Sequence, residues 1–274
     1  MPEVGYSVED RIATVRLAAP DRGNAFTPAL RREMNEALLR YRDDEDAWVA
    51  VVCGAGPDFC AGSADEAPET TSARQQRARL WAGGYVEVWK PAIAAIQGAC
   101  KGEGLALALG CDLRVAAEDA RFEAGFTGSA EPDVTAAWLI NLVGLAKAFE
   151  LLWLDESLSA DDAFAFGLVN RIVTRGQPDS PVEASGRLPM NPMRAILTAP
   201  EGDVYEGALA FARELLLYAP VTRAFQKETA LRSIGVPFAY AQTLELGPNP
   251  YASEDRVEGT RAFVENRRPE WRNR

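Results

Sequence analysis

The stretch IQGACKGEGLALALGCD, residues 96–112, joins an apolar run to a helix-forming run through three glycines, at positions 98, 102 and 104. Glycine inside regular structure costs roughly 0.5 to 1 kcal/mol relative to alanine, so three of them indicate a backbone that bends tightly or approaches another group closely. Gly102 and Gly104 stand where the helix is expected to begin. The first N–H groups of a helix lack intrahelical acceptors and lie at the positive end of its dipole. We therefore expect amides of this loop to face a ligand.

Strand and helix patterns alternate on both sides of this stretch. Residues 11–20, RIATVRLAAP, alternate apolar and polar side chains and predict a strand that Pro20 ends. Residues 27–44 predict an amphipathic helix, with Thr27 as its N-cap and Pro28 at its first position. Further strands are predicted within 48–56, 91–98 and 112–118, and a further helix over 104–111. Because this alternation continues to about residue 173, the predicted fold class is α/β.

The C-terminal third has a different pattern. Residues 176–203 contain five prolines and show no steady period, so they predict a loop or linker. Helices are predicted after it over 204–219, 221–234 and 253–268, the last with Ser253 as N-cap. We therefore divide the chain into a core of residues 1–200 and a helical assembly region of residues 201–274.

The composition restricts the possible chemistry and partners. The chain of 274 residues has 29 Lys and Arg against 40 Asp and Glu, and this net charge of −11 argues against a nucleic-acid partner. The absence of histidine removes the commonest metal ligand and the usual Ser-His and Cys-His pairs, so we expect no metal. The longest uncharged apolar run near the middle, 134–146, is shorter than the ~20 residues of a membrane helix. The N-terminus lacks a signal-peptide pattern, so we expect a cytoplasmic protein without a membrane partner.

The cysteines and a second loop complete the list of candidate groups. Four cysteines are spaced too irregularly for a zinc site or a disulfide framework: Cys53, Cys60, Cys100 and Cys111. The loop PDFCAGSADE, residues 57–66, follows the strand that ends near Cys53 and again offers small residues. Two amides, one from each loop, that converge on one carbonyl oxygen would form an oxyanion hole, with each donor contributing roughly 2.7 to 4 kcal/mol in the transition state.

The ordered combination of these motifs resembles the crotonase family of enoyl-CoA hydratases and isomerases. The resemblance rests on FCAG at 59–62, AAIQGACKGEG at 94–104, LALGCDLRVAAEDARF at 107–122, GLVNRIV at 167–173 and SEDRVEGTRAFVENRRPEW at 253–271. It implies a spiral of ββα units with a C-terminal helical trimerisation region. It also implies an acyl-CoA substrate, no cofactor apart from the coenzyme A of that substrate, and a homotrimer or a dimer of trimers.

The resemblance also implies the oxyanion-hole donors. Carried over, they are the backbone amides of Ser63 and Glu103. Glu103 departs from the family, which usually has glycine at this position. Its side chain either serves as an acid or base or turns to solvent beside Lys101, and we favour the second.

Two further departures concern proton transfer. Hydratases of the family use two glutamates, and the matching positions here are Ala106 and Phe126, neither of which can move a proton. Asp133 resembles an aspartate that serves as base or nucleophile in isomerases and in a dehalogenase, so we favour a double-bond isomerase with Asp133 as its acid and base. Asp133 is alternatively the N-cap of the following helix, and Glu123 and Glu131 are nearby acids that we expect to face solvent.

Two other activities stay open. One is hydration, or hydrolysis of a C–C or thioester bond, by Glu103 with Asp133. The other is coenzyme A binding without catalysis. Four residues are further expected to contact substrate, namely Arg22 at the coenzyme A phosphates, Ala61, Phe126, and Phe263 at the ligand of a neighbouring subunit. The role of Asp65 is open because it stands one place after the family's usual aspartate.

Overall fold

The computed structural model describes residues 2–64, 87–125, 134–154, 156–173, 196–197, 203–244, 246–247 and 249–274. Several predictions fall on residues outside these ranges: those for Asp65, Phe126, Glu131 and Asp133, and most of the loop predicted over 176–203. Within the described ranges no helix is both long and apolar enough to cross a bilayer.

A sheet of seven strands forms the centre of the molecule. Its strand order is β1-β2-β3-β4-β6-β9-β10. The strands are β1 (Val4–Glu9), β2 (Ile12–Leu17), β3 (Val49–Gly54), β4 (Ala92–Ile96), β6 (Leu113–Ala117), β9 (Arg171–Val173) and β10 (Ile196–Leu197). β1 runs antiparallel to β2, and all the other neighbours are parallel. The continuous apolar runs of β3 and β4 fit this arrangement, because strands inside a parallel sheet are buried on both faces.

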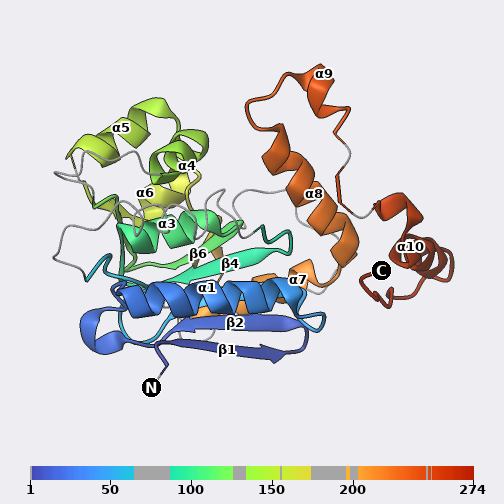
Figure 1. Cartoon of the computed structure of the whole chain (residues 1–274), viewed down its shortest axis with the longest axis horizontal. Helices are drawn as coiled ribbons and strands as arrows, with labels where there is room; N and C mark the ends of the chain where they lie inside the picture. The colour runs from blue at the N-terminus through green and yellow to red at the C-terminus, as the bar shows by residue number, and fades with distance from the viewer. Residues whose placement is uncertain are drawn as a thin grey trace.

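Helix α1 (Pro28–Asp43) lies along one face of the sheet (Figure 1). It begins as predicted, since the Thr27 side chain accepts a hydrogen bond from the Leu30 amide. Its apolar stripe is buried, and the charged Arg31 is buried with it, at 9% exposure. The apolar stripe predicts that its own side chains are buried, but it does not predict the burial of Arg31.

Helix α3 (Glu103–Gly110) is the central helix of the same face. It follows the short strand β5 (Ala99–Lys101), which forms a second sheet with β7 (Arg121–Glu123) and β8 (Leu158–Ser159). At the carbonyl end of α3 the buried Arg114 guanidinium donates to the Ala108 carbonyl at 3.2 Å and the Cys111 carbonyl at 2.8 Å. Three helices, α4 (Val134–Val143), α5 (Leu145–Leu154) and α6 (Ala160–Ala165), are grouped beyond α3 in Figure 1.

The helices that follow β10 divide into two groups. α7 (Val204–Leu215) packs on the opposite face of the sheet, where Ala208 and Ala212 share a core with Val51 and Ile93. Helices α8 (Pro220–Ser233), α9 (Phe238–Ala241) and α10 (Glu254–Val264) extend away from the sheet to one side (Figure 1). The predicted boundary at residue 200 places α7 in the same region as the extended helices, although α7 packs on the sheet of the core.

Two strands differ from the sequence-based prediction. β1 was not predicted, because its turn to β2 uses Asp10 and Arg11 in the left-handed region, at φ 48° and 66°, without the glycine or asparagine that marks such turns. β10 lies within the segment predicted as a loop and pairs in parallel with β9. A strand of two residues is too short to give an alternating pattern.

Candidate active site

The two glycine-containing loops lie side by side at the N-terminal end of α3. The Cys60 amide donates to the Ala99 carbonyl, and the Lys101 amide donates to the Cys60 carbonyl, both at 2.9 Å. These bonds form a parallel bridge between Cys60 and Cys100. Ser63 lies three residues after Cys60, and Glu103 lies three residues after Cys100. The predicted pair of donor residues therefore comes from adjacent segments.

The backbone around Ser63 is held from one side. The Phe26 amide donates to the Gly62 carbonyl at 2.7 Å, and the Ala64 amide donates to the Phe26 carbonyl at 2.9 Å. Since consecutive residues of an extended segment direct their N–H groups to opposite sides, this ladder directs the Ser63 N–H away from Phe26.

Glu103 is the first residue of α3, so its N–H belongs to the first turn of the helix. The preceding Gly102 has φ 51° and ψ −114°, which side-chain residues rarely adopt. Gly104 is needed for a different reason: a Cβ atom there would lie 2.6 Å from the Cys60 Cβ. One glycine therefore makes the turn, and the other lets the two loops approach.

The Glu103 side chain differs from the prediction, because it does not turn to solvent beside Lys101. It points towards α1, where the Arg31 Nη2 lies 2.7 Å from Glu103 Oε2 and the Arg31 Nε lies 2.9 Å from Oε1. Lys101 instead pairs with Glu123 at 2.6 Å, so Glu123 is also bound rather than simply facing solvent. The physical reason is that a buried guanidinium on α1 requires a carboxylate partner, and Glu103 supplies it.

Other predicted site residues are placed as follows. Ala61 lies beside the loop that carries Arg22, since the Ala61 amide donates to the Gly23 carbonyl at 2.8 Å. The Arg22 side chain is 36% exposed and pairs with Glu3 at 2.6 Å. Phe263 is 87% exposed on α10, which Figure 1 shows far from the N-terminal end of α3 within one chain.

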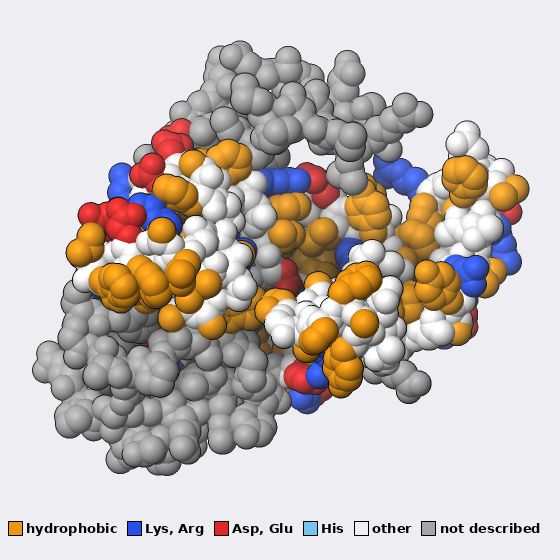
Figure 2. Space-filling model, turned by 90° about the horizontal axis from the view of Figure 1, so that it is seen from above, with side chains coloured by type: hydrophobic (Ala, Val, Ile, Leu, Met, Phe, Trp, Pro, Cys, Tyr) orange, Lys and Arg blue, Asp and Glu red, His pale blue; other side chains and the backbone are white. Residues whose placement is uncertain are grey.

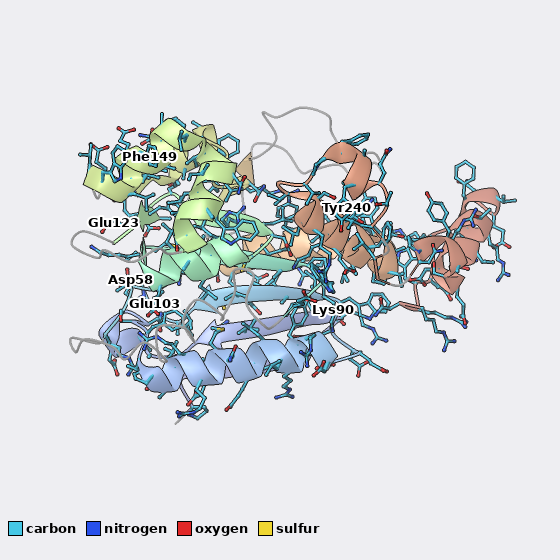
Figure 3. All side chains as sticks on the ribbon, turned by 45° about the horizontal axis from the view of Figure 1, so that its top comes forward. Asp58, Lys90, Glu103, Glu123, Phe149 and Tyr240 are labelled. Atoms are coloured by element: carbon cyan, nitrogen blue, oxygen red, sulfur yellow. The ribbon has the colours of Figure 1, made fainter. Side chains whose placement is uncertain are left out.

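Polar side chains that the sequence-based prediction missed support both loops. The Asp58 carboxylate accepts from the Ala99 amide at 2.8 Å, and the buried Asn24 donates to the carbonyls of Ala55 and Asp58 at 2.9 Å. Figure 3 shows Asp58, Glu103 and Glu123 near one another, while Lys90 and Tyr240 lie towards the other side. Arg31 was missed as well, although position 31 borders the apolar stripe of α1, three residues before Met34.

The cysteines near the loops are unsuited to nucleophilic catalysis. All four are buried, and none of them forms a disulfide. Burial raises the pKa of the Cys60 thiol to about 12 and that of the Cys53 thiol to about 11. Because the thiolate is the reactive form, these groups are almost entirely inactive thiols near neutral pH.

A cavity of about 760 Å³ lies elsewhere, between α8 and the C-terminal ends of α1 and α3. Its walls include Trp89, Trp138 and Arg223. Figure 2 shows the corresponding hollow between the α4–α5 group and α8. Neither Ser63 nor Glu103 lines this cavity, so the cavity and the pair of loops are separate features of the described part of the chain.

Comparisons with known proteins bear on this site. The family model described as "Enoyl-CoA hydratase/isomerase" matches residues 7–185. The chain is 29% identical to (E)-benzylidenesuccinyl-CoA hydratase of Thauera aromatica, with 98% of each chain covered. It is 33% identical to 4-chlorobenzoyl coenzyme A dehalogenase-2 of Arthrobacter sp, with 63% of this chain and 67% of that one covered. The structure of enoyl-CoA hydratase EchA1 from Mycobacterium marinum superposes with a TM-score of 0.79 at 27% identity, with both chains covered completely.

These results confirm the predicted crotonase-type fold. The matched residues 7–185 include both loops, α1 and α3. Ser63 and Glu103 therefore both lie inside the region that the family model matches. The chain belongs to the enoyl-CoA hydratase/isomerase family.

Proposed function

We propose that the protein binds an acyl-CoA thioester and holds its carbonyl oxygen between the backbone amides of Ser63 and Glu103. One observation carries this proposal: the Cys60–Cys100 bridge brings the two donor residues together at the N-terminal end of α3. Negative charge develops on the thioester oxygen when a proton leaves the neighbouring carbon. Two N–H donors and the positive end of a helix dipole would stabilise that charge.

The reaction that we favour is movement of a double bond. A carboxylate takes a proton from C2 of a 3-enoyl-CoA, which leaves a dienolate in the oxyanion hole. The same carboxyl group then gives the proton to C4, and the double bond moves from C3–C4 to C2–C3. We assign this acid and base to Asp133, which lies outside the described residues, so the assignment rests on the sequence.

The composition of α3 supports isomerisation over ordinary hydration. Hydratases of the family need a glutamate three residues after the helix-opening donor, and this chain has Ala106 there, in the same turn of α3 as Glu103. A methyl group cannot activate water. Isomerisation needs only one proton-transferring group, so this loss does not affect it.

A substrate panel tests the proposal. Purified protein is incubated in D₂O with 3-enoyl-CoA and 2-enoyl-CoA thioesters of several chain lengths, and the products are identified by mass spectrometry. We expect 3-enoyl-CoA and 2-enoyl-CoA to interconvert, with deuterium at C2 or C4 to the extent that the proton held by the carboxyl group exchanges with D₂O before it is returned. Conversion of 2-enoyl-CoA only to 3-hydroxyacyl-CoA would contradict isomerisation.

Hydration is the second candidate, because the relative from Thauera aromatica is named a hydratase and because Glu103 places a carboxylate at the N-terminal end of α3, next to the loops. The same panel separates the two reactions by their products. If hydration is found, replacement of Glu103 by glutamine should abolish it. A protein that binds these thioesters but converts none of them would match the third possibility, binding without catalysis.

We also propose assembly as a homotrimer or a dimer of trimers. Large hydrophobic side chains are exposed on α5 and on α9, including Trp153 at 69% and Phe238 at 79%. Figure 2 shows orange groups of this kind over both parts of the viewed face. Burying such groups in subunit contacts would be favourable. Light scattering should give the mass of three or six chains, and a monomer at micromolar concentration would exclude this assembly.

A further inference from the structure

Arg31 reaches from α1 to both loops of the candidate site. Its guanidinium donates to both carboxylate oxygens of Glu103 and, through Nη2, to the Ser63 Oγ at 3.1 Å. The same Nη2 lies 3.4 Å from the Phe26 carbonyl, which also accepts the Ala64 amide. One rigid group thus bonds the side chains of the two residues whose amides are the proposed donors.

The surroundings screen this contact less than a surface ion pair. The Arg31 side chain is 10% exposed and that of Glu103 is 19% exposed, so water screens the pair only weakly. The guanidinium meets the carboxylate in the two-bond geometry that fixes direction as well as distance. A lysine could not reproduce it, because an ammonium group is a point charge without this planar fork.

We propose that Arg31 is a positioning residue that clamps the two oxyanion-hole loops together. The inference rests on the proposed function of the amides of Ser63 and Glu103. The Cys60–Cys100 bridge aligns the two segments, and they remain in backbone contact at the next level, where a Cβ on Gly102 would lie 3.7 Å from the Gly62 Cα. Arg31 adds a side-chain link between them at residues 63 and 103, the level at which the amides would meet the thioester. It also balances the Glu103 charge, which would otherwise oppose an enolate forming nearby.

A double-mutant cycle tests the clamp. Arg31→Met should lower kcat by about 10- to 100-fold, with KM changed little, because displacement of a donor by a fraction of an ångström weakens transition-state binding more than substrate binding. The Glu103→Gly background restores the family's usual residue. In this background Arg31→Met should lower kcat by less than about 3-fold, because the ion pair between Arg31 and residue 103 is already absent. Arg31→Lys should fall between the wild type and Arg31→Met. The matched control is Arg32→Met on the exposed side of α1, which should leave kcat unchanged.

A spectroscopic readout keeps this test separate from the isomerase assignment. A bound 3-oxoacyl-CoA absorbs in the near ultraviolet when an oxyanion hole holds its enolate, whether or not the enzyme isomerises anything. We expect the enolate band in the wild type, a weaker band in Arg31→Met, and recovery of part of it in Arg31→Met/Glu103→Gly. If the wild type shows the band but no isomerisation, the isomerase proposal fails and the clamp is still judged by the band.

Three results would overturn the clamp. The first is an equal loss of kcat, or of the band, on Arg31→Met in both backgrounds. The second is a higher KM with unchanged kcat, which would make Arg31 a substrate-binding residue. The third is a wild type without an enolate band. If Arg31→Met alone fails to fold, Arg31→Lys and the double variant, which leaves no charge unpaired, supply the comparison.

Discussion

Replacement of Asp133 by asparagine is expected to lower kcat by about 10²- to 10⁴-fold, the range that a positioned general acid and base contributes. Asparagine has nearly the same shape and can still cap a helix, but it cannot accept and return a proton. Because the proposed isomerisation uses one carboxyl group for both transfers, no second group would compensate. Binding of the acyl-CoA should persist, since the amides of Ser63 and Glu103 are unchanged.

Two measurements decide this prediction. Steady-state kinetics on the best substrate of the panel gives kcat, and calorimetry with a non-reactive saturated acyl-CoA gives the dissociation constant. Glu131→Gln is the matched control, because it removes a neighbouring carboxylate two residues away and should retain turnover. Unchanged kcat in Asp133→Asn would show that the aspartate only caps the following helix and that another group transfers the proton.

The second large effect concerns the amide of Glu103 itself. Glu103→Pro should turn over about 10²- to 10³-fold more slowly than Glu103→Ala, which is the typical effect of losing one oxyanion-hole donor. Proline is well tolerated at the first position of a helix and removes only the N–H group there. Glu103 occupies that position in α3. Both variants lose the contact with Arg31, so the difference between them reports on the N–H alone.

The comparison of kcat in the two variants is the deciding measurement. Circular dichroism and thermal unfolding should show that both variants fold, as a proline at this position leaves the hydrogen bonds inside α3 intact. Equal turnover in Glu103→Pro and Glu103→Ala would exclude the Glu103 amide from the reaction, and with it the proposed oxyanion hole.

The parallel core of the fold could be predicted because burial on two faces leaves a strong signal. The apolar runs of β3 and β4 and the capped stripe of α1 appear where the patterns place them. β1 could not be predicted from its turn, since Asp10 and Arg11 are held in the left-handed region by strand pairing rather than by their own preference. Tertiary pairing, not local propensity, decides such positions.

Part of the candidate site could also be predicted from the sequence. Glycines are typical of tight turns and of close backbone approach, and Gly102 and Gly104 lie at such positions in the structure. The predicted direction of the Glu103 side chain was wrong because the direction depends on Arg31, which lies 72 residues away in the sequence. The roles of Asp133 and Phe126 stay predictions, as these residues are outside the described ranges.

Helix α3 carries the candidate site at one end and the buried Arg114 at the other. It is only eight residues long, or about 12 Å, and the Arg31 and Arg114 guanidinium groups bond to its two ends. A short helix that is bonded at both ends cannot tilt or slide without breaking charge-assisted hydrogen bonds in largely buried surroundings. If the candidate site changes shape, the change is therefore expected in the segments around α3 rather than in the position of α3 itself.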